Sequence, residues 1–142
     1  MIKKAELYKE RTDLMAKKST ITLYRRIKLA QITSGKIDKI PKIAYMAFGS
    51  GGVDENGDPI MPSAEQTELN NEICRVPIYS VEFPEETTVK YTAILPQGQY
   101  TGEKINEFAL IDEDGHLCAV QNTYTKQKDE DLTMTWEIED QF

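Results

Sequence analysis

The second half of the sequence contains five short apolar or alternating segments, and nothing between them has the spacing of a helix. The segment at residues 131–140 alternates most clearly, since its apolar and polar residues fall on opposite faces of a strand. Parallel strands need long crossover connections, which are usually helices. The pattern therefore predicts an antiparallel β-sheet or sandwich built from residues 75–83, 87–96, 104–112, 116–124 and 131–140.

Turn residues separate these segments. Asp114 and Gly115 lie between two apolar runs, and glycine supplies the positive φ that a tight hairpin turn needs. Polar stretches at residues 96–102 and 125–131 predict longer loops. Residues 42–49 form one more apolar run that ends in glycine, which predicts an additional short strand.

The first forty or so residues favour helices instead. Residues 4–18 carry a narrow apolar stripe among charged side chains. Residues 20–35 place Leu23, Ile27 and Ala30 at helical spacing. Two helices are therefore predicted before the first strong strand signal.

The ends of the second predicted helix also have sequence signals. Ser19 or Thr20 is the expected N-cap, because a hydroxyl there can accept a hydrogen bond from the first turn. Gly35 suits the position just after the last turn. The β-branched content of residues 20–23 leaves a strand as the alternative for that stretch.

A third, shorter helix is predicted at residues 62–73. Ser63 and Gln66 have the spacing of a capping box, in which each side chain bonds the backbone N–H of the other residue. Pro77 limits how far such a helix can run.

These patterns predict the α+β class: N-terminal helical segments and one short internal helix, packed on a mainly antiparallel sheet or sandwich. The chain of 142 residues suits a single domain, residues 1–142. Within it, residues 1–41 are expected to be a mostly helical, basic segment, and residues 42–142 a β-rich, acidic core.

Charge and hydropathy exclude several classes of partner. The net charge of −7 argues against nucleic acid, whose phosphates are bound mainly by Lys and Arg. Most of the basic residues lie before Ile43, so a basic docking face in the N-terminal region is one interpretation and a solvated helical face is the other. We find neither a membrane-spanning apolar run nor a secretion signal, and we expect no membrane association.

Residues 49–62 form a long glycine-rich, acidic loop. Its Gly-Ser-Gly-Gly start matches neither nucleotide-binding motif, and the acidic residues would repel phosphate. Asp54, Asn56, Asp58 and Glu65 have the spacing of calcium ligands in an EF-hand, which makes them weak metal candidates. Pro59 occupies the position where that motif needs glycine, and a solvated acidic turn explains the same residues.

Elsewhere the sequence gives little support for catalysis. Asp112, Asp114 and His116 are spaced at every second residue, but a hairpin turn with solvated side chains accounts for them as well as a metal does. His116 is the only histidine, and we predict no catalytic residues and no cofactor. Cys74 and Cys118 are expected to be buried thiols, with a disulfide between them as the alternative.

Three ordered motifs resemble the phage tail-collar fibre family, the N-terminal domains of tail fibre proteins in contractile phages and phage-like particles. They are YMAFGSGG at residues 45–52, PSAEQTELNNEICRVPI at 62–78 and EKINEFALIDEDGHLCAV at 103–120. The resemblance extends from about Lys42 to the end of the chain, and three motifs in order are more specific than any one of them.

The resemblance implies a non-enzymatic structural component of a phage or prophage tail, made in the bacterial host cytoplasm and assembled into the virion. Many family members continue into a long fibre, whereas this sequence begins with a charged segment and stops at Phe142. We therefore expect a collar or adaptor at the junction between baseplate and tail fibre. The family also implies a homo-oligomer, commonly a trimer, and other tail, baseplate or fibre subunits as partners.

A second function of a different class stays open: a β-rich module that binds a small ligand, carbohydrate or Ca²⁺ through the acidic loop. For the structural role, the candidate partner-binding residues come from the basic N-terminal region and from the loop. They are Lys17, Lys18, Arg25, Arg26, Val53, Asp54, Glu55, Asn56 and Asp58.

Overall fold

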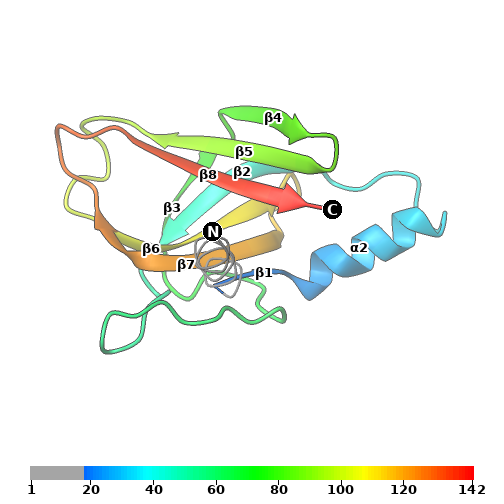
Figure 1. Cartoon of the computed structure of the whole chain (residues 1–142), viewed down its shortest axis with the longest axis horizontal. Coiled ribbons are helices and arrows are strands. Elements are labelled where there is room, and N and C mark those ends of the chain that lie inside the picture. The colour runs from blue at the N-terminus through cyan, green and yellow to red at the C-terminus, as the bar shows by residue number, and fades with distance from the viewer. Residues whose placement is uncertain (1–17) are drawn as a thin grey trace, which may run out of the picture.

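The computed structural model describes residues 18–142, which form two antiparallel β-sheets packed face to face (Figure 1). The larger sheet has five strands in the order β1-β7-β6-β2-β3, and the smaller has three in the order β4-β5-β8. All the described strand pairs are antiparallel, as predicted. The strands are β1 (Ser19–Ile21), β2 (Ile43–Gly49), β3 (Glu72–Pro77), β4 (Ser80–Glu85), β5 (Thr88–Leu95), β6 (Lys104–Asp112), β7 (Leu117–Gln127) and β8 (Met134–Gln141).

The predicted α+β class is wrong, because the described part of the chain is mostly β. Its one helix is α2 (Leu23–Thr33). The helix predicted at residues 4–18 lies outside the described residues, apart from Lys18. Tertiary contacts override local helical signals at two places in the described chain: β1 pairs with β7, and Glu107 binds the backbone of the stretch that follows residue 63.

The internal helix predicted at residues 62–73 is absent from the described structure, and turns take its place. Half of the predicted capping box forms: the Ser63 N–H donates to Gln66 Oε1 at 2.9 Å. Ser63 Oγ accepts from the Glu65 N–H at 3.2 Å, and the Gln66 N–H donates to the Ser63 carbonyl instead of the Ser63 hydroxyl. The N–H groups of Asn70 and Asn71 bond the Glu107 carboxylate instead of helix carbonyls. A side chain of the sheet thus takes the donors that a helix would need.

The second predicted helix exists but begins later than expected. Residues 19–21 form β1, which pairs with β7, so the strand alternative holds for Thr20 and Ile21 but not for Leu23, where the helix begins. Thr22 is the N-cap, and its side-chain oxygen accepts a hydrogen bond from the Arg25 N–H. Gly35 follows the C-cap residue Ser34 with a φ of 79°, the left-handed conformation that glycine adopts without strain.

Residues 75–83 were predicted as a single strand, but the chain crosses from one sheet to the other in this stretch. β3 ends at Pro77, which has no N–H for continued pairing. The Ile78 N–H then donates to Ala44 of the larger sheet, and the Tyr79 N–H donates to Thr92 of the smaller one. Two adjacent residues therefore link the two layers.

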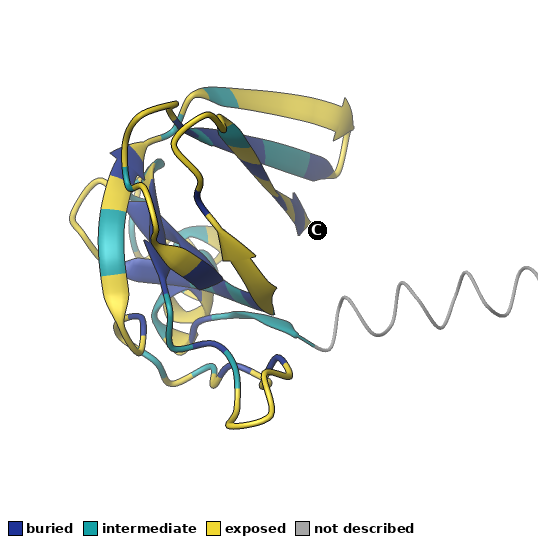
Figure 2. Ribbon diagram, turned by 90° about the vertical axis from the view of Figure 1, so that its left-hand side faces the viewer, coloured by how far each residue is buried: buried dark blue, intermediate teal, exposed yellow. Residues whose placement is uncertain are grey.

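The main core lies between the sheets, where Trp136 of β8 meets two phenylalanines of the larger sheet. Its ring centroid is 4.8 Å from that of Phe108 and 5.4 Å from that of Phe48. Trp136 and Ile138 of β8 are buried and the intervening residues exposed, which confirms the predicted alternation. Figure 2 shows this buried interior between mostly exposed loops. A smaller apolar cluster on the outer face of the larger sheet includes Leu69.

Candidate functional site

The longest connection in the described structure, residues 49–71, runs from β2 to β3; we call it the glycine loop. It is held by Glu107 of β6, whose side chain is fully buried. Glu107 Oε2 accepts hydrogen bonds from the Gly51 and Asn71 N–H groups at 2.6 and 2.8 Å. Glu107 Oε1 accepts one from the Asn70 N–H at 2.9 Å. One carboxylate thus ties both ends of the loop to the sheet.

The first glycines of the loop are there because the chain approaches the sheet closely. A Cβ atom on Gly51 would lie 2.8 Å from Glu107 Oε2, and one on Gly52 would lie 2.7 Å from Asn122 Oδ1. Both distances are shorter than side-chain contacts allow. The glycine-rich sequence therefore reflects this packing, and no phosphate is needed to explain it.

Two asparagines fix the base of the loop's projecting part. Asn106 Oδ1 accepts a hydrogen bond from the Gly52 N–H at 2.7 Å, and Asn122 Nδ2 donates to the Ile60 carbonyl at 2.8 Å. The Ile60 N–H also donates to the Gly52 carbonyl at 3.0 Å. Both asparagines are buried, so the projecting part starts from a fixed position.

The projecting part, residues 53–59, is a tight turn that we call the tip. Val53 and Pro59 pair across its base. Asp54 Oδ1 accepts hydrogen bonds from the Asn56 and Asp58 N–H groups at 2.9 and 3.0 Å, and Gly57 has a φ of 82°. Asp54, Glu55, Asn56 and Asp58 are all exposed. The tip therefore presents negative charge on an ordered backbone.

The calcium spacing seen in the sequence does not become a coordination sphere in the structure. Asp54 Oδ1 is already occupied by two backbone N–H groups. Among residues 18–142, no group of three or more His, Cys, Asp or Glu side chains is arranged to hold a metal ion. The turn itself accounts for the geometry of Asp54, Asn56 and Asp58, and Glu65 lies outside that turn.

Asp112 bonds the backbone of the β6–β7 hairpin. It is buried, and its Oδ1 accepts hydrogen bonds from the Asp114 and His116 N–H groups at 3.0 and 2.9 Å. The predicted hairpin at Asp114 and Gly115 is confirmed, with a φ of 87° at Gly115. Asp112 Oδ2 accepts a hydrogen bond from the Tyr24 hydroxyl at 2.8 Å, so the same carboxylate holds α2.

The residues around Asp112 show no activated nucleophile. The Tyr24 ring stacks on His116 with centroids 4.4 Å apart. Burial, together with the hydrogen bond to Asp112, raises the pKa of the Tyr24 hydroxyl. Burial also raises the pKa of the Cys118 thiol to about 11, and that of the Cys74 thiol to about 11. Both cysteines are free; Cys118 is buried, as predicted, whereas Cys74 is only half-buried.

A buried ion pair fastens α2 to the smaller sheet. Arg25 Nη2 lies 2.8 Å from Asp140 Oδ2, and both side chains are almost inaccessible to solvent. Burial raises the pKa of the Asp140 carboxyl, and the Arg25 guanidinium offsets part of that rise. Of the predicted basic docking residues, Arg25 is therefore engaged within the chain, Arg26 is exposed, Lys18 is half-buried and Lys17 lies outside the described residues.

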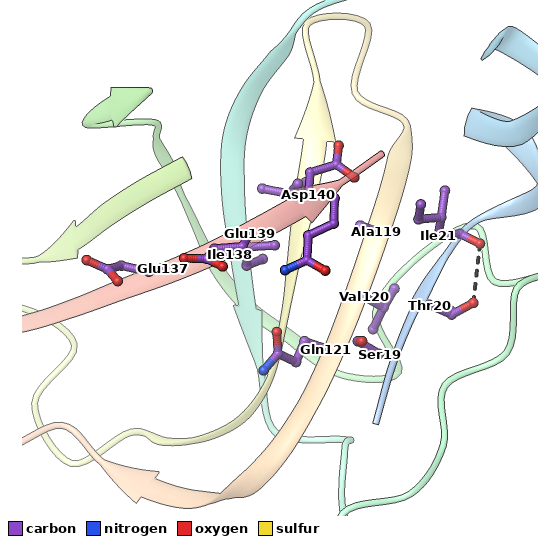
Figure 3. Close-up of a pocket in the computed structure, with 12 residues that line it drawn as sticks. Ser19, Thr20, Ile21, Ala119, Val120, Gln121, Glu137, Ile138, Glu139 and Asp140 are labelled. Carbon is purple, nitrogen blue, oxygen red and sulfur yellow. Dashed lines mark hydrogen bonds between the residues drawn. The ribbon is translucent and has the colours of Figure 1, made fainter. Parts of the chain in front are cut away.

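A groove of about 620 Å³ opens between β1 and β7 on one side and β8 on the other (Figure 3). Its apolar lining comes from residues such as Val120 and Ile138, and acidic residues such as Glu137 and Glu139 line the β8 side. No histidine, cysteine or lysine of the described chain lines it.

Sequence reasoning missed the residues that hold this architecture: Asn106, Glu107, Asn122 and the Arg25–Asp140 pair. One signal was present, because Asn106 and Glu107 interrupt an otherwise apolar strand. A buried carboxylate needs hydrogen-bond partners, so such an interruption indicates a structural anchor. The partners themselves, which are backbone N–H groups, carry no sequence signal.

These features define a β-sandwich whose buried polar groups position backbone, loops and a helix, as in a structural or docking module. Residues 15–136 match the family described as phage tail-collar fibre protein, N-terminal, and the chain belongs to that family. The resemblance noted in the sequence is thereby confirmed, and the chain is a structural component of a phage tail. No curated protein sequence matches it. Within the described residues, no helix is long and apolar enough to cross a membrane.

Proposed function

We propose that this chain is a non-enzymatic adaptor at the junction between baseplate and tail fibre, and that the tip of the glycine loop is its docking element. The observation that carries the proposal is the threefold anchoring of the loop by Glu107, which leaves an ordered acidic turn exposed. Membership of a phage tail family supplies the setting. Other tail, baseplate or fibre subunits are the proposed partners.

A fixed loop is suited to docking for a physical reason. A flexible loop must lose conformational freedom when it binds, and that loss reduces affinity. Here the hydrogen bonds of Glu107, Asn106 and Asn122 order the loop before any partner arrives. The exposed carboxylates of Glu55 and Asp58 then favour a partner surface that carries Lys or Arg.

The proposed role also implies where the protein is made and where it acts. It is made in the cytoplasm of the bacterial host and incorporated into the tail particle. It works there as a homo-oligomer, with the trimer as the proposed state. Neither a cofactor nor a metal takes part in this role.

The test removes the charge of the tip without removing its fold. In the double variant Glu55→Gln/Asp58→Asn, Asp54 and its backbone hydrogen bonds remain. We expect its incorporation into tail particles to fall about tenfold, as the loss of about 1.4 kcal/mol of interface energy would produce. The measurement is quantitative immunoblotting of purified particles from a strain complemented with each variant.

The matched control is Glu65→Gln/Glu68→Gln, which removes two exposed carboxylates of the same loop outside the tip. It should be incorporated like the wild type. A second test variant replaces residues 54–58 with Asn-Gly and so shortens the tip. Wild-type incorporation of both tip variants would refute docking through the tip.

A further inference from the structure

The predicted apolar stripe of α2 faces solvent rather than the core. Leu23 and Ile27 are each 47% exposed, and Ala30 is exposed as well. The helix attaches by its other face, through Tyr24 and Arg25. Leu23, Ile27 and Ala30 follow one another at i, i+4 and i+7, the spacing of a helix that inserts into a partner's apolar surface. We call these three residues the α2 stripe.

A second exposed apolar surface lies on β4. Tyr79, Val81 and Phe83 are 71%, 52% and 67% exposed, and we call them the β4 patch. Val81 pairs with Tyr91 of β5, a core residue, so Val81 lies on the inner face of the sheet. β4 is the edge strand of its sheet in the described structure, and edges of this kind normally carry charged residues that discourage contacts.

The two surfaces have opposite charge. α2 carries no acidic residue, and two of its basic residues, Arg26 and Lys28, are exposed or half-exposed, whereas Arg25 is buried against Asp140. Glu85 and Glu86, at the end of β4 and just after it, are exposed. Glu82 lies on the opposite face of the strand from Val81, where Lys90 is 3.8 Å from both Glu82 and Glu137. A basic helix with an apolar stripe therefore complements the patch in charge as well as in hydrophobicity.

The edge of β4 is poorly suited to pairing with a second β4. Antiparallel self-pairing centred on Glu82 would bring two carboxylates face to face, which is destabilising. Pro84 and the irregular register between Glu82 and Glu85 would interrupt the new ladder. The patch thus favours a helix over a strand as its occupant.

We propose that the chain self-associates by placing the α2 stripe of one copy on the β4 patch of another. Arg26 of the first copy then lies beside Glu85 and Glu86 of the second. α2 and the arrowhead end of β4 lie toward the same end of the molecule (Figure 1). α2 meets the glycine loop outside the tip, where the Leu23 N–H donates to the Ala64 carbonyl at 2.7 Å. The contact is independent of the tip, but it rests on the homo-oligomer proposed above and names the surfaces through which its copies meet.

The experiment measures association of the full-length protein by sedimentation velocity over a range of concentrations. Ile27→Glu removes the stripe and Phe83→Lys removes the patch, and each should raise the dissociation constant at least tenfold. An equimolar mixture of the two variants keeps one intact stripe and one intact patch, so it should associate again. Tyr124→Ser is the control, because Tyr124 is an exposed aromatic residue of β7 outside both surfaces.

A charge exchange tests the orientation. Arg26→Glu should weaken association, and adding Glu85→Lys and Glu86→Lys should restore it. Monomeric wild-type protein at all concentrations would overturn the proposal, and so would an oligomer that neither Ile27→Glu nor Phe83→Lys weakens. Particle incorporation of the tip variants tests a different surface. A negative result for self-association is therefore distinguishable from a negative result for docking through the tip.

Discussion

At the scale of single residues, Glu107 is the side chain that anchors the glycine loop to the sheet. One buried carboxylate accepts three backbone N–H groups from two distant points of the chain. The hydrogen bonds offset the cost of burying the charge, and the charge in turn strengthens them. The acidic residue within an apolar strand could be seen in the sequence, but its partners could not, because any residue type supplies a backbone N–H.

Replacing Glu107 with glutamine should therefore destabilise the protein. The amide keeps one acceptor oxygen, but its NH₂ group would face N–H donors and leave at least one of them unpaired. We expect a loss of about 2–3 kcal/mol in the free energy of unfolding, measured by urea denaturation. Glu103→Gln, an exposed residue just before the same strand, should change it by less than about 0.5 kcal/mol. Equal stability of the two variants would contradict the anchoring role.

At the scale of elements, α2 shows that helical spacing of apolar residues can predict a helix without predicting which face of it packs on the sandwich. The spacing of Leu23, Ile27 and Ala30 correctly predicted a helix, but not the face by which that helix attaches. Arg25 and Tyr24 make the attachments, at 2.8 Å each, to Asp140 and Asp112. Such long-range polar pairs have no sequence spacing to reveal them, whereas strand alternation in β8 and the hairpin glycine are local and were predictable.

Removing Arg25 should release α2 from the sandwich. Arg25→Ala leaves Asp140 buried without its partner, which costs roughly 3–5 kcal/mol of stability. The double variant Arg25→Met/Asp140→Leu removes both charges and should recover most of that loss. Urea denaturation compares the two variants, and adding the single variants Arg25→Met and Asp140→Leu completes the cycle that gives the coupling energy.

The control for this pair is Arg26→Ala, which truncates the neighbouring exposed side chain and should stay within about 0.5 kcal/mol of the wild type. If Arg25→Ala also changed the free energy of unfolding by less than about 0.5 kcal/mol, the ion pair would contribute nothing to holding the helix.

At the scale of the whole molecule, the antiparallel sandwich followed from strand after strand without intervening helices. Pro77 was a sequence signal that the strand at residues 75–83 is interrupted, but the change of sheet at Ile78 and Tyr79 depends on tertiary pairing and was not predictable. The resemblance rested on ordered motifs, and the structure gives these motifs scaffold roles: Gly49 and Gly51 leave room for the Glu107 side chain, Glu107 anchors the loop and Gly115 turns the hairpin.

The account predicts that calcium leaves the stability of the protein unchanged. Thermal unfolding in about 5 mM calcium and in excess chelator should give melting temperatures within about 1 °C, since Asp54 already bonds the turn backbone. A calcium site occupied at 100 times its dissociation constant would add about 2.7 kcal/mol. A rise of several degrees in calcium would favour the ligand-binding function over the structural one.

Photo-crosslinking within assembled tail particles tests the central claim most directly. A photoreactive amino acid at position 55 places the probe on the exposed tip, and one at position 68 places it on the same loop away from the tip. The account predicts that position 55 crosslinks to a different tail subunit, identified by mass spectrometry, and that position 68 does so much less. Absence of this chain from intact particles, or crosslinks from position 68 alone, would contradict it.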